Sequence, residues 1–205
     1  DYVDLSVYDS LEEVKQMKIS IVNRVKLGIE MLNSIKNLHE TKGKIYVDIS
    51  QGNVLINPSE LSIKIIDNDN IGFTSDEVVG TRGYMNKHIL LGGNPNFESD
   101  TFACYVFFHE LVFSHHPFDG VYAESFSTLE EGVSKAISND KGYIFNSTEN
   151  SVLENDERTQ AIWDYFLTDS VKNMFIRMFS EYVRFDLVIA VFNEFIAEAR
   201  ECICK

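Results

Sequence analysis

Apolar positions divide much of the chain into helix-like stretches. Between residues 19 and 39 they recur at three- and four-residue steps, which predicts an amphipathic helix with one face on a core. The run DTFACYVFFHELVF is apolar nearly all round, as is typical of a buried helix, so we expect a central helix within residues 99–118, ended by Pro117. Three further amphipathic helices are predicted within residues 161–200.

Two short β-branched runs interrupt the helical pattern. They extend from Val54 to Ile56 and from Ile63 to Ile66, and the turn-rich sequence NPSELS between them predicts a β-hairpin. Asp48 and Asn53 precede the first strand, and Asp67 follows the second. Because a hairpin folds back on itself, these three polar side chains are expected at the same end. The predicted fold class is therefore mainly α with a small β-hairpin.

Two stretches lack clear periodicity. Residues 68–98 contain five glycines, which favours a long ordered loop with a functional role. Residues 121–160 hold eight acidic and three basic side chains, so we expect a variable, solvated surface segment, with docking of a partner protein as the alternative. The central helix and its end contain three histidines, His109, His115 and His116. No other metal-ligating residue lies at ligand spacing from them, so we expect them on the helix surface and at its terminus.

Composition limits the classes of partner and compartment. The chain has 205 residues with 44% hydrophobic content, enough for a core, and neither an apolar run of membrane-spanning length nor a signal-peptide pattern. Eighteen basic against 32 acidic residues give a net charge of -14, which argues against nucleic acid and anionic membrane as partners. Three cysteines cannot all pair in disulfide bonds within the chain, which suits a reducing compartment, so we expect a cytoplasmic protein. Since residue 1 is Asp, we expect a piece of a longer chain.

The spacing of Asp48, Asn53 and Asp67 suits phosphate chemistry. Hard cations such as Mg²⁺ take oxygen ligands from a carboxylate, an amide and substrate phosphates, and Mn²⁺ is the alternative ion. Asn53 and Asp67 match that donor set. Asp48 would then be free to orient an attacking hydroxyl and accept its proton.

Several segments resemble the protein kinase superfamily. YVDISQGNVLI and IKIIDNDN are similar to the catalytic loop H-R-D-L-x-x-x-N and to the metal-binding D-F-G segment. GTRGYM at residues 80–85 resembles the end of an activation segment, and ESDTFACYVFFHELVFSHHPFDG resembles the kinase helix that ends in G-x-x-P-F. The D-x-D form in place of D-F-G looks most like a bacterial Ser/Thr protein-kinase-like branch.

The resemblance implies a kinase C-terminal lobe that uses ATP and Mg²⁺. The glycine-rich loop and the strand lysine of the N-terminal lobe do not occur in this sequence, so we expect that lobe as a missing partner and an inactive isolated chain. The lobe would be divided into the hinge and following helix (1–16), catalytic loop and hairpin (44–67), activation segment (67–90), central buried helix (99–118), acidic variable segment (121–160) and C-terminal helices (161–200).

The resemblance also assigns roles to single residues. Asp48 would be the catalytic base, and Asp100 a helix N-cap that tethers the catalytic loop. The expected metal ligands are Asn53, Asp67 and Asp69, and the expected substrate and activation-segment residues are Thr81, Gly83 and Tyr84. Purely structural roles remain open as alternatives: the DND sequence could form a turn after a strand, and Thr81 could be an ordinary loop residue.

The sequence departs from the kinase pattern at several positions. Val47 replaces the arginine before the catalytic Asp, a non-RD feature that argues against activation by a phosphorylated segment. Ser50 stands where Ser/Thr kinases usually have a lysine, and NDN follows the strand in place of an F-G sequence. NKH replaces A-P-E, so Arg184 would find His88 rather than a glutamate, and that structural ion pair is lost or rebuilt.

Two main functional hypotheses follow. The chain is either part of an ATP- and Mg²⁺-dependent transferase acting on protein hydroxyls, or a pseudokinase that serves as a scaffold for another protein. A third hypothesis, an aminoglycoside-type small-molecule phosphotransferase, shares the D-x-x-x-x-N logic but does not predict GTRGYM or the HPF ending.

Overall fold

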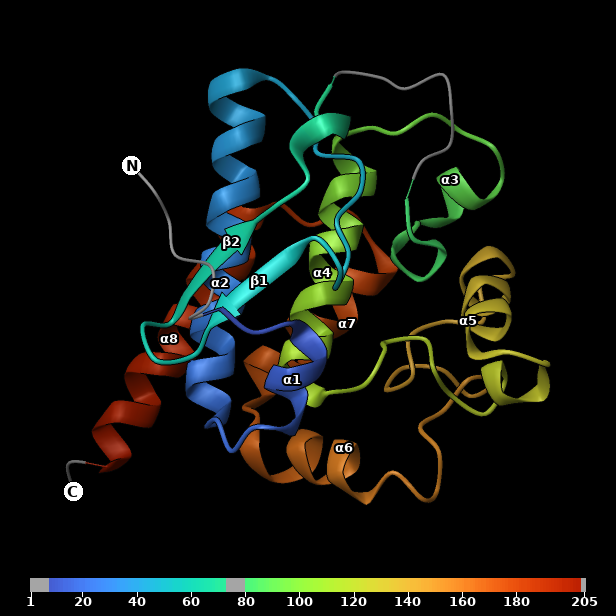
Figure 1. The fold of residues 1–205 in the computed structure, drawn as a ribbon. Helices are drawn as coiled ribbons and strands as arrows, with labels where there is room; N and C mark the ends of the chain where they lie inside the picture. The colour runs from blue at the N-terminus through green and yellow to red at the C-terminus, as the bar shows by residue number, and fades with distance from the viewer. Residues whose placement is uncertain (1–7, 73–79, 204–205) are drawn as a thin grey trace.

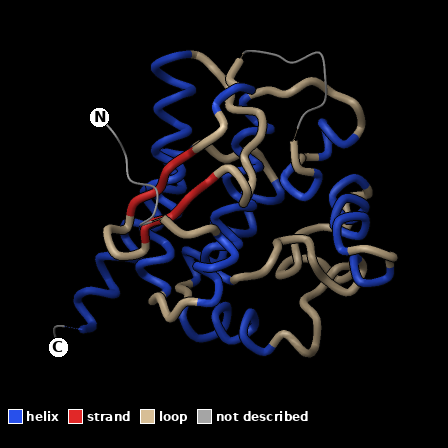
Figure 2. Tube along the Cα trace, in the orientation of Figure 1, coloured by secondary structure: helices blue, strands red, loops and turns tan. Residues whose placement is uncertain are grey.

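The structure, a computed structural model, describes residues 8–72 and 80–203. This part of the chain is mainly helical with one antiparallel two-stranded sheet, which confirms the predicted fold class (Figure 1, Figure 2). The regular elements are α1 (Leu11–Gln16), α2 (Ile21–Asn37), β1 (Val54–Asn57), β2 (Ser62–Ile65), α3 (Lys87–Leu90), α4 (Phe97–Phe113), α5 (Leu129–Ser138), α6 (Glu157–Ala161), α7 (Asp169–Ser180) and α8 (Phe185–Ile203). Short 3-10 or π turns occur at η2 (Leu38–Lys42), η3 (Asn68–Asn70), η4 (Arg82–Tyr84), η5 (Ala123–Ser125) and η6 (Ile162–Phe166).

Helix α4 forms the centre of the fold and contacts α1, α2, α7 and η4. It lies so close to α2 that a Cβ on Gly28 would be 2.2 Å from the Phe108 ring, so only glycine permits this approach. The helix ends at Phe113, because Ser114 adopts a left-handed conformation with φ 59°. The expectation that it continues to Pro117 is therefore wrong, since the left-handed residue stops the helical hydrogen bonds first.

The predicted hairpin is confirmed with small shifts at its ends. Val54 pairs with Ile65 and Asn57 with Ser62 in an antiparallel register. At the turn, the Asn57 side-chain oxygen accepts hydrogen bonds from the backbone N–H groups of Ser59 and Glu60, each at 3.1 Å. The turn therefore depends on an asparagine that bonds its own following backbone, and this fixes the strand register.

A buried arginine joins three helices at one end of the fold. Arg24 of α2 is 1% exposed and donates to backbone carbonyls of Leu111 at 2.8 Å and of Val14 and Met17 at 3.1 Å each. These carbonyls lie at or near the C-terminal ends of α4 and α1, where helix dipoles favour a cation. Burial lowers the pKa of Arg24. The side chain therefore acts as a shared C-terminal cap for α1 and α4.

The acidic stretch 121–160 lies largely at the surface, but part of it is buried, so it is not solvated along its whole length. It contains α5, and Val133, Ala136 and Ile137 of that helix are buried in a small second core with Phe118. Buried Asn150 donates to the Phe118 carbonyl at 3.0 Å and accepts from the Tyr122 N–H at 3.2 Å. Periodicity missed this helix because its buried face is short and its remaining positions are charged.

The C-terminal region is helical, but the first of its three helices begins at Glu157, before the predicted range 161–200. Helix α6 continues into the π turn η6, and α7 and α8 follow as amphipathic helices that pack on one another. Helix α8 also packs along α2 (Figure 1). Across the described ranges, no helix has both the length and the apolar character needed to cross a bilayer.

His109 of α4 is fully buried, which contradicts its expected place on the helix surface. Its ring stacks on Phe113 with centroids 4.3 Å apart and meets Tyr143 edge-on at 5.4 Å. Nδ1 bonds the His115 carbonyl at 2.8 Å, whereas Nε2 has no partner within the part of the chain that the structure describes. Burial lowers the pKa of His109, and burial likewise lowers the pKa of His116.

These buried rings predict a stability that decreases in mild acid. Below the ordinary histidine pKa of about 6.5, the unfolded chain takes up protons that folded His109 and His116 do not. The stability is therefore fully present above the ordinary histidine pKa of about 6.5 and falls as the pH decreases below it, by up to roughly 1.4 kcal/mol per pH unit for each ring. Guanidinium unfolding at several pH values measures this slope.

The matched variants are His109→Gln, which keeps a donor but does not titrate, and His88→Gln at an exposed histidine. His109→Gln should flatten the slope, and His88→Gln should leave it unchanged. An unchanged slope in His109→Gln would contradict the assignment.

Candidate active site

The backbone of the predicted catalytic loop is held in an uncommon conformation. Val47 has φ 78°, which a β-branched residue rarely adopts and which costs free energy unless neighbouring contacts hold it. The contacts come from the Asp100 carboxylate, which accepts from the Tyr46 N–H at 2.6 Å and from the Val47 N–H at 2.9 Å. His39 Nε2 lies 3.0 Å from the same carboxylate. One buried side chain therefore fixes the two residues that precede Asp48.

Asp100 performs this role from the first turn of α4. It is 2% exposed, and the N-terminal end of a helix favours a negative charge. The N-cap itself is Asn96, whose side chain accepts from the Ser99 N–H at 2.9 Å, so the expectation that Asp100 is the N-cap is wrong. Its predicted contact with the catalytic loop is present. The helix begins earlier than the apolar run indicated, because Asn96 and Ser99 form a capping box.

Asp48 is held by Asn53 and keeps one oxygen free. The Asn53 side-chain nitrogen donates to Oδ2 of Asp48 at 3.0 Å and to its backbone carbonyl at 2.8 Å. Oδ1 of Asp48 is buried and has no hydrogen-bond partner among the described residues. A buried carboxylate oxygen without a donor is costly in a folded protein. An incoming hydroxyl group would supply the missing donor.

The base of the hairpin brings the Asp67 segment to the same place. The Ile66 N–H donates to the Asn53 carbonyl at 2.9 Å, so Asn53 lies opposite the residue before Asp67. The Tyr46 hydroxyl donates to the carbonyl of Ile66 and, at 2.8 Å, to that of Asp67. Burial raises the pKa of Tyr46, and the carboxylates of Asp67, Asp48 and Asp100 raise it further.

The oxygen donors at this edge fit a hard cation. Because the Asn53 nitrogen is used by Asp48, its side-chain oxygen is left for a metal. Asp67 and Asp69 are exposed at the same end of the hairpin, with Asp67 in a left-handed conformation of φ 58°. Over the described ranges, no three His, Cys, Asp or Glu side chains group closely enough to hold a metal. The donor set therefore depends on the asparagine and on oxygens that a phosphate would add.

The predicted activation segment lies directly beside Asp48. Residues 73–79 of this segment fall outside the described residues. Gly80 has φ 135°, and a Cβ on it would be 3.6 Å from Oδ1 of Asp48 and 3.5 Å from the Val47 carbonyl. Thr81 is exposed, and within the structure's described part its hydroxyl makes no hydrogen bond to Asp48. Among the described residues of this segment, Gly80 therefore lies next to the candidate base.

Two polar contacts anchor the rest of this segment on α4 and the turn that follows it. The hydroxyl of buried Tyr84 donates to Glu110, which also lies 3.4 Å from Lys15 near the end of α1. His116 Nε2 donates to the Gly83 carbonyl at 2.9 Å, and its Nδ1 accepts from the Phe118 N–H at 3.1 Å. Burial raises the pKa of Tyr84 well above its ordinary value, and Glu110 raises it further.

The sequence did not indicate the contacts that Glu110 and His116 make with this segment, nor those of Lys15 with Glu110 and of His39 with Asp100. A glutamate inside an apolar helix was the available sign, because a buried carboxylate requires hydrogen-bond partners.

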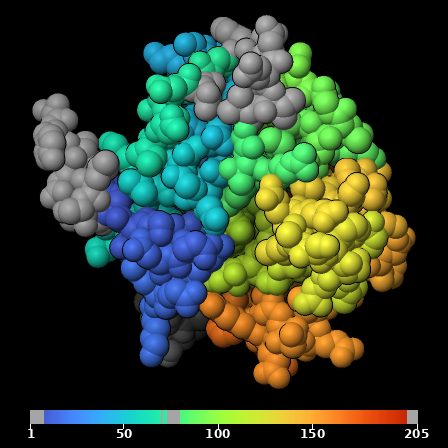
Figure 3. All heavy atoms as spheres, turned by 45° about the vertical axis from the view of Figure 1, so that its right-hand side comes forward, coloured from blue at the N-terminus to red at the C-terminus, as the bar shows by residue number. Residues whose placement is uncertain are grey.

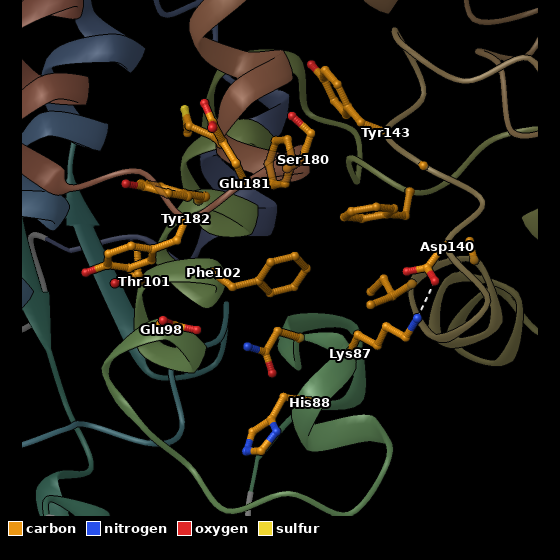
Figure 4. Close-up of a pocket in the computed structure, with 18 of the residues that line it drawn as sticks. Lys87, His88, Glu98, Thr101, Phe102, Asp140, Tyr143, Ser180, Glu181 and Tyr182 are labelled. Carbon is orange, nitrogen blue, oxygen red and sulfur yellow. Dashed lines mark hydrogen bonds and ion pairs between the residues drawn. The ribbon is translucent and has the colours of Figure 1, made fainter.

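The segment NKH forms a different contact from the expected one. His88 lies 3.2 Å from the Asn94 carbonyl and Arg184 bonds Asp186 at 3.1 Å, so the two are not paired. Lys87 forms an ion pair with Asp140 at the end of α5 instead. Figure 4 shows this pair at the edge of a cavity of about 430 Å³, lined on other sides by aromatic residues such as Phe102 and Tyr182. The ion pair thus joins α3 to α5 rather than to the C-terminal helices.

Comparison with known proteins identifies the family of the chain. A family model described as protein kinase domain matches residues 2–181. This range includes the catalytic loop, the hairpin, the activation segment and α4. No curated protein matches the chain.

The Tyr84 contact generates a stability prediction. Tyr84→Phe removes the donor to Glu110 and leaves a buried carboxylate oxygen unpaired, which should lower the free energy of unfolding by about 1–3 kcal/mol. Guanidinium unfolding at pH 7 measures this change. The control is Tyr182→Phe, which removes a hydroxyl from a side chain that is 57% exposed and should change stability by less than about 0.5 kcal/mol. Equal effects of the two variants would show that the Glu110 contact contributes nothing.

Proposed function

Because the chain belongs to the protein kinase family, we propose that it supplies the catalytic base and the metal-holding residues for phosphate transfer from ATP to a protein hydroxyl. The observation that carries this proposal is Oδ1 of Asp48, which is buried and has no hydrogen-bond partner within residues 8–72 and 80–203. The atom belongs to a carboxylate whose other oxygen is fixed by Asn53, and it lies beside Gly80 of the activation segment. A substrate hydroxyl that donates to Oδ1 would satisfy it and be oriented for attack.

The chain's own residues would divide the work as follows. Asp48 would orient the hydroxyl and accept its proton as the hydroxyl oxygen bonds to the γ-phosphorus of ATP and the bond from that phosphorus to the leaving ADP breaks. Asn53 and Asp67 would hold Mg²⁺, with Asp69 as a further carboxylate, and the ion would neutralise charge on the phosphates of ATP. Asp100 acts as a positioning residue, because it fixes the backbone of Tyr46 and Val47 next to the base.

A second function, scaffolding without catalysis, is favoured by specific departures from the kinase pattern. Ser50 is 5% exposed and places no cation where transfer to protein hydroxyls usually has one. The segment after Asp67 forms the short turn η3 with exposed Asn68 and Asp69, not a hydrophobic anchor. In that case the folded lobe would present a surface to a partner protein.

We also infer a cytoplasmic location. ATP and Mg²⁺ are abundant there, and the buried free thiol of Cys104 suits a reducing compartment. The partners we propose are an N-terminal kinase lobe and a protein substrate.

The experiment that separates the two functions is phosphate transfer from labelled ATP by the full-length protein. Asp48→Asn keeps the size of the side chain and its contact with Asn53 but removes the base, so transfer should fall by roughly 10²- to 10⁴-fold. Asp164→Asn, at an exposed aspartate of η6, is the matched control and should retain wild-type transfer.

Equal incorporation by wild type and Asp48→Asn would exclude Asp48 as the base. No incorporation by the wild type, together with tight binding of a partner protein, would favour the scaffold.

A further inference from the structure

A groove runs between α3 and α5, on the side of the molecule where the activation segment ends. It has a volume of about 630 Å³ and is lined by Gly80, Arg82, Leu91, Ser134 and Lys135, among others. In Figure 3, α5 (yellow) lies against the green segment that holds η4 and α3. The volume lies within the range of ligand sites, about 300–1,000 Å³.

The groove is continuous with the candidate base. Gly80 lines it and also lies next to Asp48, since a Cβ on Gly80 would be 3.6 Å from the unpartnered Oδ1. Arg82 follows two positions later, and two residues of chain span at most about 7 Å. A peptide with its hydroxyl at Asp48 could therefore reach the groove within two or three residues.

The groove carries positive charge on a strongly acidic chain. The protein has 18 basic residues and a net charge of -14, yet among the residues that the structure describes, the charged side chains lining the groove are Arg82 and Lys135. Both are exposed, and neither forms an ion pair within residues 8–72 and 80–203. The neighbouring cation, Lys87, is already paired with Asp140. Two cations that line one groove and have no ion-pair partner among the described residues favour an anionic ligand.

Neutral groups in the groove also lack partners. The Ser134 hydroxyl lies on a residue that is 7% exposed, and its oxygen has no hydrogen-bond partner in the described structure. Leu91 is 68% exposed at the same groove, so its side chain is accessible to a ligand. An apolar side chain of a bound peptide would cover the leucine.

We propose that this groove binds an acidic segment of the protein substrate. Arg82 and Lys135 pair with a glutamate or aspartate two or three residues from the acceptor hydroxyl, and Leu91 packs on an apolar neighbour. The inference rests on the proposed function, because it takes Asp48 as the position of the hydroxyl. It adds the chemical class of substrate: an acidic rather than a basic peptide.

The test measures peptide binding without phosphate transfer. Fluorescence anisotropy is recorded on the full-length Asp48→Asn protein with labelled serine peptides that carry Glu or Gln at two and three residues from the serine on both sides. The Glu peptide should bind roughly tenfold more tightly at low salt, and the preference should decrease as salt is raised. Arg82→Gln and Lys135→Gln should each reduce the preference by about three- to fivefold, because each removes one partly exposed pair.

Lys18→Gln, at an exposed lysine between α1 and α2, is the matched control and should keep the full preference. Lys135→Glu should favour a Lys peptide over the Glu peptide. Equal binding of Glu and Gln peptides to the protein, or a full preference in the Arg82→Gln/Lys135→Gln double variant, would overturn the inference. Because no transfer is measured, a catalytically inactive protein that still prefers the Glu peptide would count against the proposed function alone.

Discussion

The candidate site depends on one buried carboxylate, that of Asp100. It accepts hydrogen bonds from the backbone of Tyr46 and Val47, and these bonds offset the free-energy cost of the left-handed conformation of Val47. A carboxylate can do this because it accepts several N–H groups at once and because α4 holds it at a helix N-terminal turn. Without this carboxylate, the backbone of the loop would adopt another conformation and the Asp48 side chain would no longer be held in its orientation.

The surrounding structure makes this contact rigid. Helix α4 is packed on α2 through the close approach at Gly28, and Arg24 fixes its C-terminal end. The base of the hairpin then places Asp67 beside the loop, and Tyr84 attaches the activation segment to Glu110 of the same helix. The central helix therefore orients both the candidate base and the segment beside it, and its two buried acids, Asp100 and Glu110, make these contacts.

Local patterns in the sequence predicted those features that depend on local physics. Apolar periodicity gave α2 and α4, and β-branched runs with an asparagine turn gave the hairpin that gathers Asp48, Asn53 and Asp67. The helix end at Ser114 was missed because a left-handed serine has no clear pattern. The burial of α5 and the partners of Asp100 and Glu110 were missed because they depend on residues distant in the chain.

Amide hydrogen exchange tests most directly whether Asp100 holds the backbone of Tyr46 and Val47. The Asp100→Ala protein is compared with wild type and with Glu98→Ala, which changes an exposed acid in the same helical turn. We expect at least roughly tenfold faster exchange of the Tyr46 and Val47 amides in Asp100→Ala, with protection retained in the second half of α4 and no change in Glu98→Ala. Unchanged protection of these two amides in Asp100→Ala would contradict the claim that this carboxylate holds the catalytic loop.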